Sequence, residues 1–162
     1  MATITFKGGE KYMLKLSRLE NATLTKVCGP AIHDGAEVVA NAIRSELQNV
    51  PTDEGWGTQT NPTQGPKKEQ KAALLDALGI TTMRTDEHGM LNVKIGFDGY
   101  NSIKTKRWPN GQPNQMVARA IESGTTWMRK NRFVSKAVSK TKKQALAAMQ
   151  RRAETEIKKI MK

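Results

Sequence analysis

The segment that most constrains this chain is an alternating stretch at residues 90–98. Leu91, Val93, Ile95 and Phe97 fall on one side of an extended backbone, and polar or small residues stand between them. This period of two predicts a β-strand with one apolar face. Burying four such side chains stabilises the folded state by roughly 6–12 kcal/mol, before the cost of conformational entropy is subtracted. Other elements must therefore cover this strand.

A second strand is expected just before it, over Ile80–Thr85. The turn Asp86–Gly89 joins the two strands, and Gly89 supplies a residue that tolerates a positive φ. The hairpin Ile80–Phe97 is therefore expected to form the centre of a small antiparallel sheet. A further short strand is expected at residues 3–6, followed by a helix from about Glu10 to Glu20.

Three helices are expected around the hairpin: Pro30–Gln48, Lys67–Leu78 and Asn114–Ser123. Pro suits a first helical turn, and Gly124 suits the position just past a helix end. The first helix is expected to lie on the sheet. Its apolar stripe consists of Ile32, Ala36, Val39, Ile43 and Leu47.

The last part of the chain differs in kind, because residues 134–161 contain neither Pro nor Gly and consist mainly of strong helix formers. They predict a helix of roughly 40 Å, which needs another element to lie against. Its expected apolar stripe is Val134, Val138, Ala145, Met149, Ala153, Ile157 and Ile160. The predicted fold class is α+β: a small antiparallel sheet with a central hairpin, packed against amphipathic helices, and a long C-terminal helix. Residues 1–133 form the expected core domain, with residues 51–66 as a loop insertion, and residues 134–162 form the long basic helix of the same domain.

The loop insertion, Pro51–Pro66, has no periodicity and contains one bulky residue, Trp56. A structureless loop of this length in a small domain often serves binding. The alternative is a mobile surface excursion with Trp56 packed back for cover.

Composition limits the function classes. The single Cys28 cannot form an internal disulfide, no apolar run is long enough to span a bilayer, and the first residues lack the pattern of a secretory signal. We expect a protein made in the cytoplasm that does not enter a membrane. His33 and His88 lack metal-ligand spacing, and no nucleophile or phosphate-loop motif is present, so neither an enzyme nor a cofactor or metal site is expected.

The formal net charge is +12, and most of the excess lies beyond residue 128. Such a surface attracts phosphate backbones or acidic proteins. No aromatic residues interleave with these charges and no helix-turn-helix pattern precedes them, which favours an acidic protein partner or a solvated face over DNA. The candidate basic face comprises Lys136, Lys140, Lys143, Arg151, Arg152 and Lys158.

The order of these segments resembles the tail-component family of long-tailed bacteriophages, small neck or tail-completion proteins from the head-to-tail joining region. The resemblance covers nearly the whole chain and is closest to versions in prophages of Gram-positive bacteria. Its most recognisable feature is Glu-x-Gly-Thr, followed by Phe and a basic helix, which Glu122, Gly124, Thr125 and Phe133 match. The family usually has Pro immediately before that Phe and again three residues after it, where this chain has Arg132 and Lys136.

The resemblance implies a structural virion protein of the phage neck or tail, located in the host cytoplasm during assembly. Its implied partners are copies of itself in a ring, as a hexamer or dodecamer, and neighbouring connector, tail-terminator or tail-tube proteins, close to packaged DNA. The family has no catalytic residues to carry over. The candidate structural and interface residues are Glu122, Gly124, Thr125, Trp127 and Phe133. Gly124 and Thr125 are expected to shape a turn, and Phe133 to anchor the last helix to the core. The alternative function is a basic nucleic-acid-binding protein.

Overall fold

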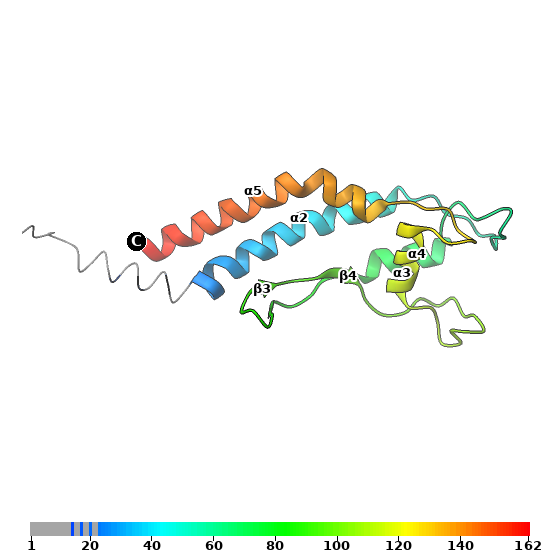
Figure 1. Ribbon diagram of the computed structural model, residues 1–162, viewed down its shortest axis with the longest axis horizontal. Helices are drawn as coiled ribbons and strands as arrows, with labels where there is room; N and C mark the ends of the chain where they lie inside the picture. Colours follow the sequence, from blue (N-terminus) through cyan, green and yellow to red (C-terminus); the bar gives the residue numbers. More distant parts are fainter. Residues whose placement is uncertain (1–13, 15–16, 18–19, 21–22) are drawn as a thin grey trace, which may run out of the picture.

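Two long helices that run antiparallel, side by side, dominate the structure (Figure 1). The computed structural model describes residues 14, 17, 20 and 23–162. One helix, α2, spans Gly29–Gln48, and the other, α5, spans Phe133–Met161. The hairpin and two shorter helices, α3 (Lys68–Ala77) and α4 (Asn114–Ser123), complete the described chain. The strand expected at residues 3–6 and most of the helix expected from Glu10 lie outside the described residues.

The predicted α+β class and the central hairpin are confirmed, but the hairpin is divided into two short ladders. Strand β1 (Leu78–Ile80) pairs with β4 (Ile95–Phe97), and β2 (Arg84–Thr85) pairs with β3 (Leu91–Asn92), both antiparallel. At the interruption, the Thr81 N–H donates to the Lys94 carbonyl at 2.8 Å, and the Thr81 hydroxyl accepts the Lys94 N–H at 2.9 Å. The Thr81 hydroxyl thus accepts an N–H that would otherwise need a backbone carbonyl of the ladder. Gly89 has a φ of 77° in the hairpin turn, as expected.

Helix α2 occupies the predicted range, and Pro30 lies in its first turn, where its missing N–H needs no helical acceptor. A six-residue π-helix, η1 (Thr23–Cys28), leads directly into it. The expectation that α2 lies mainly on the sheet is wrong. It packs mainly along α5, and its main contact with the sheet is at β1. Its buried side includes Ala31, Gly35 and Ala40, small residues that let another helix approach closely.

Helix α5 also occupies the predicted range, but its expected apolar stripe is corrected. The buried residues recur every fourth position, at Phe133, Ala137, Thr141 and Ala145, whereas Val138 is 43% exposed. The physical reason is the small-residue surface of α2. Because the two helices lie close together, small side chains such as Ala137 and Ala145 fill much of their interface. Met149 of the expected stripe also lies against α2, at Gly35, whereas Val138 is left on the flank.

The main apolar core lies at one end of the helix pair. There the last turns of α2 and the first turns of α5 meet α3, α4 and the β1–β4 ladder. Phe133 is fully buried, and its ring centroid lies 6.1 Å from that of Phe97 on β4. The fully buried core side chains are Leu47, Leu74, Ile121, Phe133 and Ala137.

Candidate assembly interface

The chain reverses direction between α4 and α5 through a tight turn over residues 124–132. Gly124 has a φ of 74°, and a Cβ at this position would lie 2.9 Å from Lys130 Cβ, so the turn requires glycine. Thr125 and Met128 exchange backbone hydrogen bonds of 2.9 and 3.3 Å, and the Thr125 hydroxyl accepts the Trp127 N–H at 3.2 Å. Gly124 and Thr125 therefore shape a backbone turn that presents Trp127.

Glu122 caps the start of α5 from the neighbouring helix. Its carboxylate accepts the Val134 N–H at 2.9 Å and the Ser135 N–H at 3.1 Å, and it also accepts the Ser135 hydroxyl. The residue before the helix, Arg132, makes no side-chain cap of its own. A carboxylate at a helix N-terminus satisfies free N–H groups and complements the helix dipole. Glu122 thus ties the first turn of α5 to the last turn of α4.

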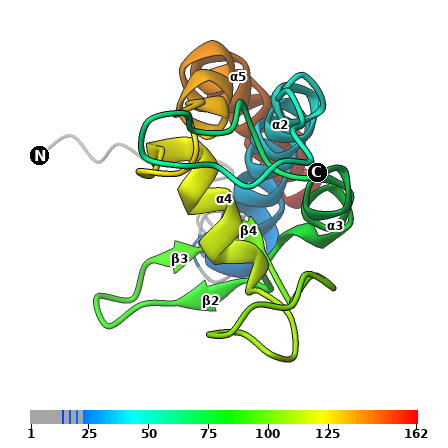
Figure 2. The ribbon, with the colours of Figure 1, turned by 90° about the vertical axis from the view of Figure 1, so that its right-hand side faces the viewer.

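The Trp56 loop, residues 51–66, is pinned by hydrogen bonds along its length. The Thr63 N–H donates to the Trp127 carbonyl at 2.9 Å, and the Thr63 carbonyl accepts the Arg129 N–H at 2.8 Å. Figure 2 shows this loop crossing the end of the molecule beside the turn that follows α4. The alternative of a mobile excursion with Trp56 packed back is not supported, since Trp56 is 72% exposed.

Asp53 holds the two arms of this loop together. Its carboxylate accepts the Gly55 N–H at 2.9 Å and the Gln64 N–H at 3.1 Å. These two donors, first Gly55 and then Gln64, lower the pKa of the Asp53 carboxyl below its usual 3.8, because they stabilise its charged form.

A hollow of about 320 Å³ lies between the Trp56 loop and the α4–α5 turn. Its lining includes Trp56, Trp127, Lys67, Gln70 and Gln112. Trp127 is 57% exposed, and the Lys67 ammonium lies 4.1 Å from the centroid of the Trp56 ring. Both indoles are therefore held at the edge of one hollow with much of their surface open to solvent. Trp56 and Trp127 are 71 residues apart in the sequence, and no local pattern indicates that they border the same hollow.

The residues of the candidate basic face fall into two groups, unpaired cations and cations paired within the chain. Within the described residues, Lys136, Lys143, Arg151 and Lys158 are exposed and have no ion-pair partner. Lys140 instead pairs with Glu46 on α2.

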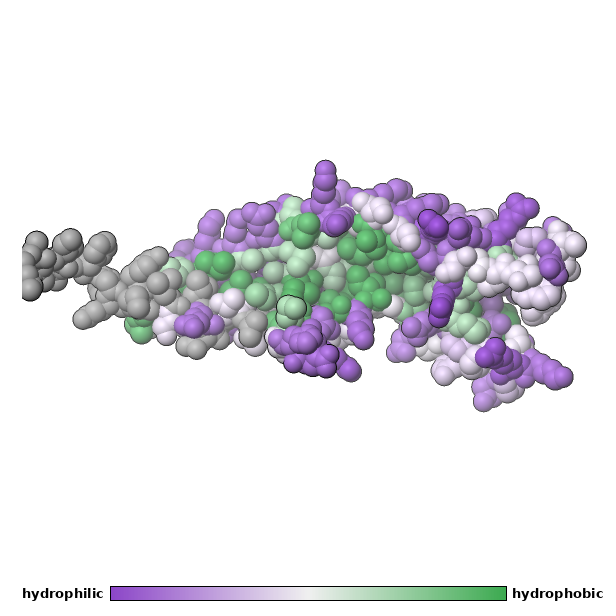
Figure 3. Space-filling view, viewed as in Figure 1, coloured by the Kyte–Doolittle hydropathy of each residue, from purple (hydrophilic) through white to green (hydrophobic). Residues whose placement is uncertain are grey.

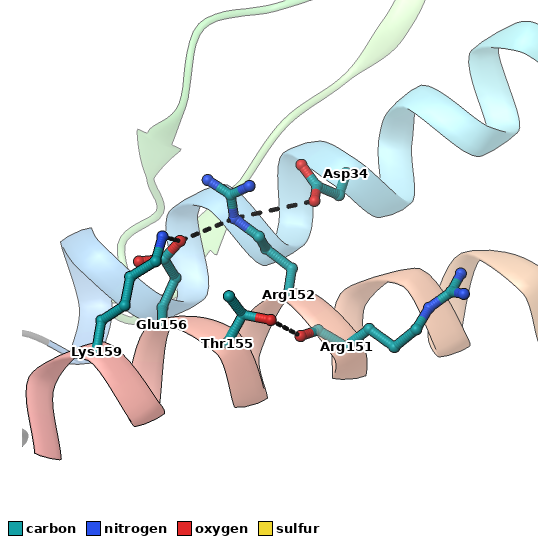
Figure 4. A network of polar contacts seen from close by, with 6 residues as sticks. All are labelled: Asp34, Arg151, Arg152, Thr155, Glu156 and Lys159. Carbon is teal, nitrogen blue, oxygen red and sulfur yellow. Dashed lines mark hydrogen bonds and ion pairs between the residues drawn. The ribbon is translucent and has the colours of Figure 1, made fainter. Parts of the chain in front are cut away.

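Arg152 is also engaged within the chain, as Figure 4 shows. Its Nε lies 3.1 Å from Glu156 Oε1 and 4.0 Å from Asp34 Oδ2, which links α5 to α2. This is an ion pair without an aligned hydrogen bond, since Nε is shielded from solvent and has no acceptor in line with it. The Arg151 side chain points away from this group (Figure 4).

Apolar side chains remain open along the helix pair. Leu146 is 57% exposed and Val138 is 43% exposed. Ala153 and Ile157, seven and eleven residues after Leu146, fall on the same side of the helix and are half-buried. We call this set the apolar flank: Val138, Leu146, Ala153 and Ile157. Figure 3 shows hydrophobic surface running along the helix pair on the face that it presents.

Other kinds of site find little support within the described residues. No group of three His, Cys, Asp or Glu side chains is arranged to hold a metal ion among them, and both histidines are exposed. No helix in the described part of the chain is long and apolar enough to cross a membrane.

Comparison with known proteins yields no relative. No family model matches the chain, and no curated protein or solved structure is detectably similar to it.

Proposed function

We propose that this chain is a structural virion protein of the phage neck or tail, which joins head to tail or completes the tail by ring-forming protein–protein assembly. The structural observation that supports assembly is the apolar flank of α5. Leu146 and Val138 expose large apolar side chains, while the buried interface with α2 is already filled by small ones. Exposed apolar surface that adjoins polar residues marks a contact site.

A ring suits this arrangement of surfaces. The flank lies along the helix pair, whereas the hollow with the two indoles lies at the end where the loops gather. Different surfaces on one protomer allow head-to-tail contacts, which close into a ring when the rotation permits. The assignment to a phage neck or tail rests on the resemblance described above.

Sizing of the purified protein tests this proposal. We expect the wild-type chain to form a closed oligomer in light scattering, and the double variant Val138→Glu, Leu146→Glu to be monomeric. The variant should unfold at nearly the wild-type temperature, because both side chains are exposed in the protomer.

Gln144→Glu is the matched control, since residue 144 is exposed and lies on the far side of the helix from Leu146. A wild-type protein that stays monomeric at all concentrations, and is absent by mass spectrometry from particles produced by the genome that encodes it, would contradict the proposal.

The unpaired cations of α5 support a second candidate function, nucleic-acid binding. Lys136, Lys143, Arg151 and Lys158 are exposed without ion-pair partners among the described residues. Contacts of four cations with phosphates predict a slope of log K against log salt of roughly −3 to −4 on duplex DNA. A titration without binding at low salt removes this candidate.

A further inference from the structure

We propose that the hollow between Trp56 and Trp127 is a docking site for an extended acidic peptide segment of a neighbouring protein, which inserts one apolar side chain between the indoles. The inference rests on the proposed function, because it names the chemistry of a partner in that assembly.

The backbone around the hollow is already held in place in the single protomer. Thr63 binds the backbone of the α4–α5 turn, and Asp53 ties the arms of the Trp56 loop together. A Cβ on Gly57 would lie 1.8 Å from the Trp127 carbonyl oxygen, so the loop and the turn are in direct backbone contact. Two large apolar side chains thus stay exposed on a fixed frame. Exposed tryptophans on preorganised backbone are typical of binding hot spots.

The charged groups in the lining of the hollow are the Lys67 ammonium and the Asp53 carboxylate. Gln70 uses its oxygen for the Lys67 N–H and its amide nitrogen for the Gln112 oxygen. The Asp53 carboxylate is occupied by two backbone N–H groups. The Lys67 ammonium, held over Trp56, has no carboxylate partner within the described residues.

The charged side chains next to the hollow also bear on the chemistry of its partner. Lys68, Arg129 and Lys130 are exposed next to the lining residues, and so are the carboxylates of Glu54 and Glu69. With Lys67 and Asp53 of the lining counted, four cations stand against three carboxylates, a local excess of +1 in a chain whose formal net charge is +12. A segment that enters here therefore gains by carrying carboxylates.

The shape of the site favours a peptide over a single-stranded nucleic acid. Strand-binding proteins stack successive bases on a row of aromatic rings along a basic groove. Here two indoles border one hollow of about 320 Å³, which suits one large apolar side chain. Trp108, the third tryptophan, borders a separate hollow with Tyr100 and Pro109.

Fluorescence titration tests the inference. In a Trp108→Phe background, Trp56 and Trp127 are the only indoles in the chain. The probes are ten-residue synthetic peptides with one central leucine flanked by aspartates, the same peptide with lysines in place of aspartates, the aspartate peptide with alanine in place of leucine, and an oligothymidine.

We expect the leucine–aspartate peptide to shift the indole emission and to bind more weakly as salt rises. Replacing its leucine by alanine should weaken binding at least tenfold, and the lysine peptide should not bind. Trp56→Ala or Trp127→Ala should each lower affinity at least tenfold, read by calorimetry. Both variants should keep the wild-type unfolding temperature, because these side chains are exposed. Lys67→Gln should weaken binding about threefold to tenfold.

Lys143→Gln, an exposed lysine on α5 far from the hollow, is the matched control and should leave binding unchanged. Four outcomes would each overturn the inference. Lys143→Gln could weaken peptide binding as much as Lys67→Gln does, or the lysine peptide could bind as tightly as the leucine–aspartate peptide. Oligothymidine could bind more tightly than that peptide, or none of the probes could bind. Mass spectrometry of assembled particles separates the two proposals. Presence of the chain in particles without peptide binding rejects only the docking site, and peptide binding by a chain absent from particles rejects the assembly function.

Discussion

At the scale of single residues, Glu122 connects the core to the long helix through two backbone N–H groups. We expect Glu122→Ala to lower the free energy of unfolding by about 1–2 kcal/mol, because the first turn of α5 loses its cap and its complement to the helix dipole. Glu122→Gln keeps an acceptor and should lose less. Urea denaturation measures both. Glu154→Gln, on an exposed part of α5, is the control, and an equal loss there would contradict the capping role.

Phe133 is the largest fully buried side chain. Phe133→Ala is expected to cost about 3–5 kcal/mol of unfolding free energy, because it leaves a cavity against Phe97 and the first turn of α5. Assembly should be lost with it. Circular dichroism during urea unfolding gives the cost. Val138→Ala, at an exposed position on the same helix, should change stability little, and a fully stable Phe133→Ala protein would show that Phe133 does not anchor α5.

Asp53 gives the Trp56 loop a dependence on pH. Its pKa is lowered in the folded chain by the Gly55 and Gln64 N–H groups. The stabilisation is therefore complete above the unfolded pKa near 3.8 and is lost as pH falls through the lower folded value. We expect the protection factors of the Gly55 and Gln64 amides, which are the exchange rates corrected for the intrinsic rate at each pH, to fall as the pH drops below 3.8, measured by NMR. Asp53→Asn should remove this pH dependence, and protection factors in the wild type that stay constant down to pH 2 would contradict it.

Only part of this residue-level detail was predictable from the sequence. Gly124 precedes a turn and Phe133 opens an apolar helix, so local pattern sufficed for both. Glu122 lies 12 residues before the backbone group that it caps, and no local pattern marks such a contact. Trp56 and Trp127 border the same hollow because a parallel bridge between Thr63 and Met128 joins their segments, and this pairing depends on the completed fold.

At the scale of elements, helices α2 and α5 pack together through small residues. The space around Gly35 shows how closely the two helices approach each other. A Cβ on Gly35 would lie 2.5 Å from Met149 Cγ, a flexible side chain. We expect Gly35→Ala alone to leave the unfolding free energy within about 0.5 kcal/mol of wild type, because improved helix propensity is offset by displacement of Met149. In a Met149→Ala background the same change should stabilise by about 1 kcal/mol.

A double-mutant cycle in thermal unfolding measures this coupling. Ser45→Ala, at an exposed position on α2, is the control and should have the same effect in both backgrounds. Equal effects of Gly35→Ala in both backgrounds would show that Gly35 and Met149 do not compete for space.

The extent of these elements was predictable, and their pairing was not. Pro30 and Gly124 mark ends of α2 and α4, and the absence of Pro and Gly defines α5. The prediction for α5 favoured large apolar side chains, and it therefore placed Val138 in the interface. The small residues of α2 select Ala137 and Thr141 as the actual contacts, and this choice depends on the partner helix, which no single segment specifies.

At the scale of the whole molecule, the core lies at one end and the start of α2 and the last turns of α5 lie at the other (Figure 1). We expect amides in residues 33–36 and 152–158 to exchange with solvent at a lower opening free energy than amides in residues 43–47 and 137–145. The distal part of the pair has few buried apolar contacts to resist local opening. Hydrogen exchange with mass spectrometry measures this gradient, and uniform protection along α5 would contradict it.

The antiparallel pairing of α2 and α5 also sets a length. The loops with Trp56 and Trp127 lie at one end of the molecule, and α5 extends roughly 44 Å toward the other at 1.5 Å per residue over its 29 residues. A protomer that contacts one neighbour at each end is a rigid spacer between them. The spacing between those neighbours is then encoded in the number of helical residues, so that inserting one heptad into both helices lengthens the gap by about 10 Å.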